Sequence, residues 1–174
     1  MTPMGHYVAI REETVMQGKK VTESEVIMLH LPMPDETNAA GSIHGGHLLK
    51  HIDNAGGIAA CRHARAHVVT AFLDRMDFLT PVHPGELIIF KASVNAVGRT
   101  SIEVGVRVEV EDMTTGSTRH TATCYLTYVA LDELRKPKEV PPLILETDIE
   151  RERHGKALQR RQLRQNREKT RPAG

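Results

Sequence analysis

Residues 100–112 alternate between apolar and polar side chains over five successive repeats. The apolar positions are all β-branched, namely Ile102, Val104, Val106, Val108 and Val110. They alternate with Glu103, Gly105, Arg107, Glu109 and Glu111. A two-residue period places these two sets on opposite faces of an extended chain. We therefore predict a strand over Thr100–Asp112 whose apolar face packs against a core.

The segments around this strand predict an antiparallel sheet. Gly85–Val97 precedes it across a turn at Gly98-Arg99. Arg119–Leu131 follows it, and short connections of this kind are typical of hairpins. Two further extended runs are His67–Phe78 and Thr22–Leu31. Since strands of ten or more residues exceed the usual ~5–6, we expect one large, curved sheet.

One segment of the core, His44–Ala64, does not fit a strand. Its apolar residues occur on nearly every side of a helical wheel, which indicates a helix buried on most sides. It also contains Gly45, Gly46, Gly56 and Gly57, and a glycine inside a helix costs roughly 1 kcal/mol relative to alanine. We expect another element to pack closely against its backbone. One apolar helix wrapped by one long antiparallel sheet is the α+β architecture called the hotdog fold.

Composition and charge exclude several classes of function. The chain has 174 residues, a net charge of +1 and no Trp, so neither a global field nor an aromatic platform favours nucleic acid. We expect no membrane span, because no run approaches the ~20 apolar residues that one needs. The N-terminus lacks the pattern of a secretory signal, so we expect a cytoplasmic protein. We interpret Cys61 and Cys124 as buried, reduced thiols.

Charge divides the chain into residues 1–145 and residues 146–174. The first part has a net charge of −3 and the second +4, from nine Lys or Arg against five Asp or Glu. Pro137, Pro141 and Pro142 mark the linker between them. We predict a single hotdog domain over 1–145 and a C-terminal charged helical tail over 146–174. Because its apolar residues are few, we expect this helix to be solvated and frayed.

The start of the central helix is the first candidate site. His44-Gly45-Gly46 follows a loop that contains Asn38. The first N–H groups of a helix lack internal partners, and the helix dipole is positive there. Glycines leave these groups uncovered, so the end could hold an oxyanion or a polarised carbonyl. The alternative is that the glycines only permit a tight turn into the helix.

Asp53 is the second candidate. It lies in the middle of the predicted helix, on a stripe with Leu49, Gly56 and Ala60 that is otherwise apolar or small. A carboxylate there is costly to bury unless it is paired or used. We favour a general base, because the small neighbours leave room for a ligand. A structural Asp bonded to a neighbouring loop is the alternative.

Three histidines, His44, His47 and His51, share one face of the predicted helix. A metal site must be considered, but Asp53 lies about 160° around the wheel from them and does not complete it. We therefore expect no metal site, and dimer packing or solvent exposure explains the histidines.

The turn Gly98-Arg99-Thr100-Ser101 is the last candidate. It combines a cation, two hydroxyl groups and backbone N–H groups, which together could grip a phosphate. The alternative is an ordinary glycine-containing turn with a solvated Arg.

Several of these stretches together resemble a known family. They are Met33-Pro34 through Asn38, His44-Gly45-Gly46, Asp53, Val69-Thr70-Ala71 and Asn95-Ala96-Val97-Gly98-Arg99-Thr100-Ser101. From about Val21 to Leu145 the chain resembles the acyl-CoA thioesterases of the hotdog fold, and more closely their cytosolic acyl-CoA hydrolase type. The resemblance implies hydrolysis of fatty acyl-CoA to free CoA and a carboxylic acid. It implies no cofactor beyond the coenzyme A of the substrate.

The resemblance also implies roles for individual residues. Asn38 would orient the thioester or the attacking water, and Asp53 of the facing subunit would act as general base or nucleophile. The residues implied to bind the oxyanion and the substrate are His44, Gly45, Gly46 and Thr70. Those implied to hold the phosphates of CoA are Gly98, Arg99, Thr100 and Ser101. The implied assembly is a homo-oligomer with a dimer as its minimal unit, built into a hexamer as a trimer of dimers.

Two other functions stay open at this point. A hotdog enoyl-CoA hydratase or dehydratase would use a histidine such as His44 together with a carboxylate. A non-catalytic module would bind CoA or a nucleotide without turnover. The sequence contains no nucleophile elbow, Walker loop or dinucleotide fingerprint that would point elsewhere.

Overall fold

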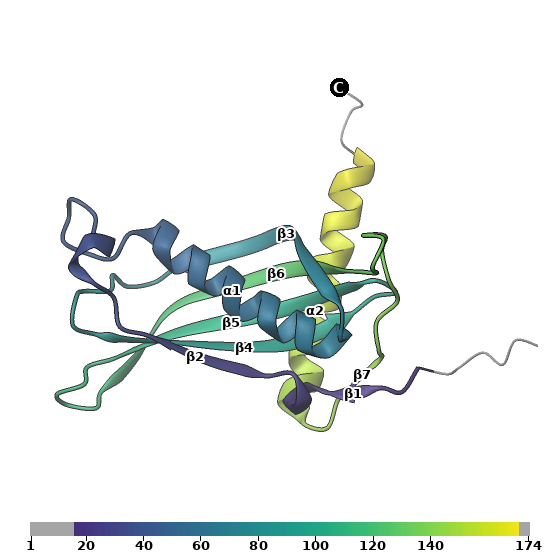
Figure 1. Ribbon diagram of the computed structural model, residues 1–174, viewed down its shortest axis with the longest axis horizontal. Helices are drawn as coiled ribbons and strands as arrows, with labels where there is room; N and C mark the ends of the chain where they lie inside the picture. The colour runs from purple at the N-terminus through teal and green to yellow at the C-terminus, as the bar shows by residue number, and fades with distance from the viewer. Residues whose placement is uncertain (1–15, 171–174) are drawn as a thin grey trace, which may run out of the picture.

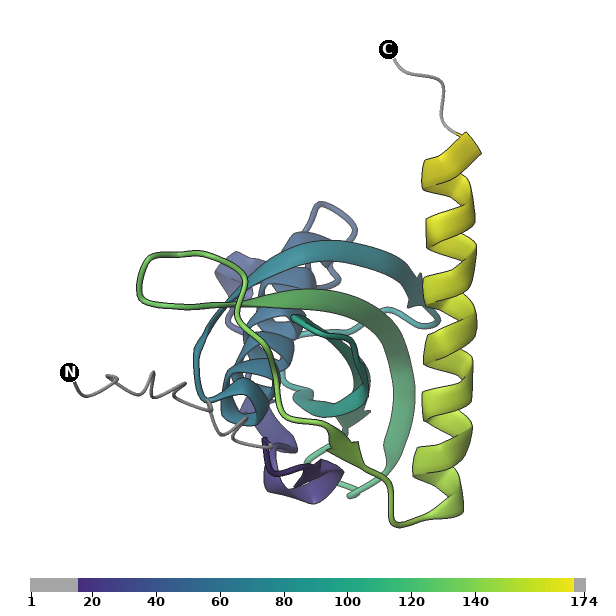
Figure 2. The same ribbon diagram turned by 90° about the vertical axis from the view of Figure 1, so that its right-hand side faces the viewer.

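The computed structural model describes residues 16–170. Its main feature is a five-stranded antiparallel sheet that curls around one helix (Figures 1 and 2). In chain order the strands are β2 (Val26–His30), β3 (His67–Phe78), β4 (Leu87–Val97), β5 (Ser101–Glu111) and β6 (Thr118–Leu131). They lie side by side in the order β2-β4-β5-β6-β3. Helix α1 (Gly45–Ala64) lies inside the curl, so the expected hotdog architecture is confirmed.

The remaining elements are short except for one helix. The short elements are η1 (Val21–Glu23), η2 (Pro34–Glu36), and the parallel pair β1 (Lys19–Lys20) and β7 (Leu143–Ile144). The prediction of a strand over Thr22–Leu31 is wrong in its first part, where the chain forms η1. There the Glu23 carboxylate accepts a hydrogen bond from the Lys20 N–H and closes a turn. Between residues 16 and 170, no helix has the length and apolar character of a membrane span.

The inner face of the sheet and α1 form the core. The apolar side chains that alternate along β5 are fully buried against the helix, as the sequence predicts. Gly56 shows why the helix contains glycine, because a Cβ at this position would lie 2.4 Å from the hydroxyl of Tyr128. A Cβ at Gly57 would meet only Tyr128 Cε1, at an ordinary 3.7 Å. The expected close approach to the α1 backbone is therefore confirmed at Gly56.

Helix α2 (Asp148–Thr170) crosses the outer face of the sheet (Figure 2). The prediction of a frayed helix is wrong, because α2 is continuous over its whole range. The prediction of a solvated helix holds for most of its side chains, which are exposed, but Arg160 and Arg164 meet acidic partners on the strands. Arg160 pairs with Glu103 on β5, which is 6% exposed. Arg160 also lies over the ring of Tyr125, 3.7 Å from its centroid. Ion pairing and a cation–π contact dock this helix without an apolar stripe.

Strand β3 is an edge of the sheet and carries exposed apolar side chains. Val69, Phe72, Leu73 and Phe78 are each more than 40% exposed. A long, apolar, unpaired edge is a surface that proteins normally cover. Cys61, on the part of α1 next to this strand, is exposed, so the prediction of a buried thiol is wrong for Cys61. The same prediction is confirmed for Cys124, which is buried.

Candidate active site

A groove of about 360 Å³ runs between α1 and the edge strand β3. Its walls include Asp53, Gly57 and Cys61 from α1, Thr70 from β3 and Tyr128 from β6. The Asp53 side chain lies between α1 and these two strands, because it contacts Thr70 on β3 and Tyr128 on β6. The groove therefore places one carboxylate beside small side chains, as the sequence predicts for a ligand site.

Two hydroxyl groups hold the Asp53 carboxylate. Thr70 donates a hydrogen bond from Oγ1 to Asp53 Oδ1 at 2.7 Å. Tyr128 donates from its hydroxyl to the Asp53 carbonyl oxygen at 3.0 Å and to Oδ1 at 3.2 Å. Burial and the nearby Asp53 charge raise the pKa of Tyr128, so its hydroxyl keeps its proton. Asp53 Oδ2 accepts no hydrogen bond within residues 16–170.

The first turn of α1 lies beside a second groove of about 320 Å³, which includes Gly45, Leu48 and Phe78. The N–H of Gly45 has no acceptor in the described part of the chain. The N–H of Gly46 donates to Nδ1 of His44 at 3.1 Å, so His44 caps the helix. Of the two predicted oxyanion donors, Gly45 is therefore available and Gly46 is occupied.

Asn38 organises its own loop. Its Oδ1 accepts hydrogen bonds from the N–H groups of Ala40 and Ser42, and its Nδ2 donates to the hydroxyl of Ser42. The carboxamide has two N–H bonds, so one remains for a ligand. The backbone N–H of Asn38 also donates to the Ser42 carbonyl, which closes the loop ahead of α1.

The turn at Gly98–Ser101 lies at the other end of the sheet from the start of α1 (Figure 1). Its Gly98 N–H donates to the Ser101 carbonyl, and Val140 donates to the Arg99 carbonyl, so part of the backbone is already paired. The guanidinium of Arg161 on α2 lies 2.9 Å from where a Cβ on Gly98 would be. The turn thus has a second cation that the sequence analysis did not assign.

A single chain does not bring the predicted residues together. His44 precedes Asp53 by nine residues, which is roughly 13 Å along a helix at 1.5 Å per residue. Asn38 lies in the loop before α1 and Gly45 at the start of that helix, whereas Asp53 lies along its middle beside Thr70 of β3, and the Gly98 turn is at the other end of the sheet. Sequence reasoning also missed Tyr128, although a hydroxyl on the core-facing side of β6 was a readable signal.

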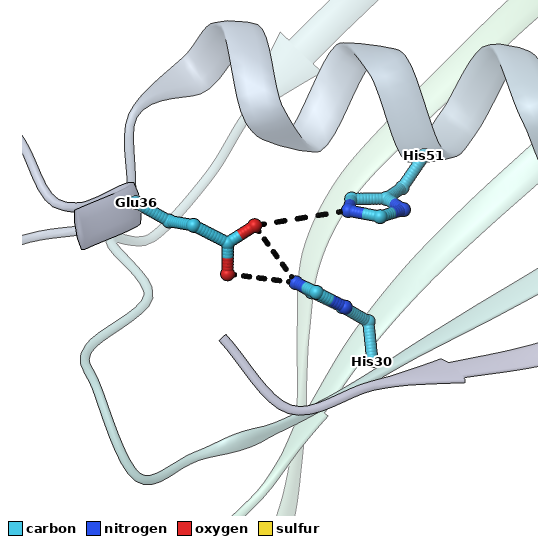
Figure 3. A group of neighbouring side chains, drawn as sticks. All are labelled: His30, Glu36 and His51. Carbon is cyan, nitrogen blue, oxygen red and sulfur yellow. Dashed lines mark hydrogen bonds and ion pairs between the residues drawn. The ribbon is translucent and has the colours of Figure 1, made fainter. Parts of the chain in front are cut away.

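The histidines of α1 differ in their surroundings, and His51 has partners that the sequence does not predict. His51 faces the carboxylate of Glu36 on η2, and His30 at the end of β2 faces it too (Figure 3). His47 contacts the same carboxylate at 3.2 Å. Burial opposes ionisation of Glu36, but the Met33 N–H, His30 and His47 hold its pKa below the ordinary 4.5. Burial and the neighbouring His30 lower the pKa of His51. Solvent exposure does not explain His51, whose side chain is 19% exposed and faces Glu36 and His30, but it does hold for His44, and the His47 side chain is 43% exposed. Dimer packing of these histidines stays a prediction.

Comparison with known proteins agrees with this fold. The Thioesterase superfamily profile matches residues 40–117. An uncharacterized acyl-CoA thioester hydrolase of Bacillus subtilis is 39% identical over 147 residues, which are 84% of this chain and 86% of that protein. The mouse cytosolic acyl coenzyme A thioester hydrolase is 30% identical over 158 residues, 87% of this chain but 42% of that protein.

Two solved structures are similar along most of their length. A hexameric acyl-CoA thioesterase superposes with a TM-score of 0.86 at 36% identity, covering 90% of this chain and 100% of that one. An acyl-CoA hydrolase from Staphylococcus aureus, in complex with butyryl coenzyme A, coenzyme A and coenzyme A disulfide, superposes with a TM-score of 0.81 at 37% identity. This match covers 86% of this chain and 92% of that one. Helix, sheet and groove thus define a thioesterase of the hotdog class. Within that class, the chain belongs to the family of acyl-CoA thioester hydrolases.

Proposed function

We propose that this protein hydrolyses the thioester of fatty acyl-CoA to free CoA and a carboxylic acid. The observation that carries the proposal is the Asp53 carboxylate, held by Thr70 and Tyr128 in a groove with Oδ2 unpaired. Family membership supports the reaction class, and the groove supports a position for the base. The second candidate function, a hydratase that pairs His44 with a carboxylate, is disfavoured because the His44 ring caps Gly46.

The active assembly we propose contains two copies that meet at β3. The Asp53 groove lies over the start of β3, at Thr70, and the Gly45 groove lies at its end, at Phe78. When identical strands pair antiparallel about a two-fold axis, the start of one lies beside the end of the other. This pairing would cover the exposed apolar edge and bring Asp53 of one copy to Gly45 and Asn38 of the other.

In this composite site each group has one task. Asp53 Oδ2 takes a proton from water, and the water oxygen attacks the thioester carbonyl carbon. The Gly45 N–H stabilises the negative charge that develops on the carbonyl oxygen. Asn38 orients the carbonyl or the water with its unused N–H. The carbon–sulfur bond then breaks, and the CoA sulfur receives the proton. In the alternative mechanism, the Asp53 carboxylate itself attacks the thioester carbonyl carbon in the same arrangement of groups.

Relatives support this choice of residues. Solved structures of the Staphylococcus aureus enzyme include alanine substitutions at an asparagine, an aspartate and a threonine that follow one another at intervals of 15 and 17 residues. Asn38, Asp53 and Thr70 follow one another at the same two intervals. The agreement of both intervals in a relative of 37% identity supports the assignment of these three residues as site residues.

The phosphates of CoA are proposed to bind at Gly98–Ser101. Arg99 is exposed there, and Arg161 from α2 adds a second guanidinium next to Gly98. Two cations at one turn favour a phosphate more than one does. The hexameric relative supports a hexamer built from the dimers proposed here. Relatives named cytosolic support a cytoplasmic location.

Thiol release from acyl-CoA substrates of increasing chain length tests the reaction. We expect turnover by the wild type and a loss of about 100- to 10,000-fold in Asp53→Asn, as for removal of a general base. Asp112→Asn, in the β5–β6 turn, is the matched control and should keep full activity. No release from any substrate would refute the proposal and leave a CoA-binding module, while addition of water to an enoyl-CoA would indicate a hydratase.

Complementation tests the composite site. Asn38→Ala and Asp53→Asn chains, each inactive alone, are mixed one to one during assembly. About half of the dimers are then mixed, and one of their two sites keeps both native residues, so activity should recover to about one quarter of wild type. If both residues served one site from the same chain, every site would carry a substitution and no activity would return.

A further inference from the structure

A cluster of imidazole and carboxylate groups lies apart from the Asp53 groove. His30 ends β2, Glu36 lies in η2 and His51 lies in the second turn of α1 (Figure 3). One ligand atom from each residue lies within 4.8 Å of the other two. Their side chains are 24%, 12% and 19% exposed, so the cluster is shielded but open to solvent on one side. Three chain segments that are distant in sequence thus converge on one point.

One nitrogen atom of each ring, Nε2, is directed at the same carboxylate (Figure 3). His30 Nε2 lies 3.1 Å from Glu36 Oε1 and 2.9 Å from Oε2, and His51 Nε2 lies 3.9 Å from Oε1. The two rings lie next to each other, with centroids 4.0 Å apart. The carboxylate is held in place from behind, because the Met33 N–H donates to its Oε2. The three donor atoms therefore face one another rather than solvent.

These distances are close to those of a metal site. Ligand atoms bound tetrahedrally to zinc at ~2.0–2.2 Å lie about 3.3 Å from one another. The Glu36–His30 separation is already slightly shorter than that, and Glu36–His51 must close by about 0.6 Å, within a small side-chain adjustment. Two imidazoles and one carboxylate are also a ligand set that zinc uses when its fourth position is left open.

We infer that His30, Glu36 and His51 bind a divalent transition metal ion, with zinc as the ion that fits the donor set. His47 contacts the same carboxylate at 3.2 Å through Nδ1 but lies outside the group of three. It acts as a positioning residue for Glu36. The inference does not depend on the proposed function, because no residue of the group lines the Asp53 groove.

A bound ion would fasten the loop that carries Asn38. Glu36 precedes Asn38 by two residues, and its backbone carbonyl accepts the N–H of His44 at the start of α1. His30 and His51 lie on the two elements that flank this loop. Metal binding therefore joins β2, η2 and α1 and restrains the position of Asn38. Ligands that bind only the folded state stabilise it by mass action.

Metal titration of the full chain, produced without a histidine tag and stripped with a chelator, tests the inference. Zinc is titrated by calorimetry, and cobalt is added as a probe whose visible absorption reports tetrahedral nitrogen and oxygen ligands. We expect one equivalent per chain, and a melting temperature raised by roughly 5–10 °C at a hundredfold excess over Kd. Absence of stoichiometric uptake by the wild type would overturn the inference.

Three variants locate the site. We expect zinc binding to weaken by at least about 100-fold in each of His30→Gln, His51→Gln and Glu36→Gln. Loss of a direct ligand lowers metal affinity more than loss of a residue that only orients a ligand. His67→Gln, an exposed histidine at the start of β3, is the matched control and should bind like wild type. Unchanged affinity in His30→Gln and His51→Gln would overturn the assignment. Melting curves of the metal-free variants show that each is folded, and if His51→Gln does not fold, His30→Gln decides.

Discussion

Gly56 and Gly57 are adjacent in α1 but face Tyr128 very differently. A Cβ on Gly56 would lie 2.4 Å from the Tyr128 hydroxyl, which real Cβ atoms do not tolerate. A Cβ on Gly57 would lie 3.7 Å from the edge of the same ring. Gly56→Ala and Gly57→Ala therefore add the same methyl group to the same helix, but only the methyl group at position 56 clashes with Tyr128.

The expected free energies follow from these contacts. Both substitutions remove helical glycine and so gain about 1 kcal/mol. Gly56→Ala additionally overpacks the core, at about 1–3 kcal/mol, and forces the Tyr128 hydroxyl off the Asp53 carbonyl oxygen, at about 1–3 kcal/mol. We expect Gly56→Ala to be destabilised by about 1–5 kcal/mol and Gly57→Ala to be unchanged or slightly stabilised.

Thermal or urea unfolding of the two variants beside wild type measures the difference. A difference of at least about 2 kcal/mol in the free energy of unfolding between the two variants corresponds to roughly 4–8 °C in melting temperature for a chain of this size. Gly56→Ala should also lose hydrolytic rate, because Tyr128 then no longer holds the carboxylate of Asp53. Equal stability of the two variants would refute the argument that Tyr128 requires glycine at position 56.

Two further predictions concern ion pairs. Arg160→Met leaves Glu103 buried without its cation and should lower the free energy of unfolding by about 3 kcal/mol. Lys156→Met removes an exposed ion pair on the same helix and should leave the melting temperature unchanged. The hydrogen bond from Arg119 outweighs burial and holds the pKa of Glu86 below the ordinary 4.5. The stability from this pair is therefore complete above pH 4.5 and is lost as pH falls through the lowered pKa. Urea unfolding at several pH values should show wild type and Glu86→Gln differing most at neutral pH and converging in acid; a constant difference would contradict this.

Several features of the protein were determined by local sequence. The alternation at 102–111 places β5 and its buried face, and the apolar segment 45–64 gives α1 within one residue of its prediction. Periodicity works here because it records which side of a strand or helix faces the core. Asp53 stands out for the same reason, as a charge on a face otherwise made of small and apolar side chains.

Other features were decided only by tertiary structure. The polar face of β5 predicts solvent around Glu103, but α2 arrives from 57 residues later in the chain and covers it with Arg160. Glu36 and His30 meet His51 because η2 and β2 pack against α1, and no spacing within the helix records that. Periodicity reports that a face is polar, but which later segment covers it depends on long-range packing. The position of Asp53 was therefore predictable, whereas its contact with Tyr128, the approach of Arg161 to Gly98 and the contact of Glu36 with His51 required the fold.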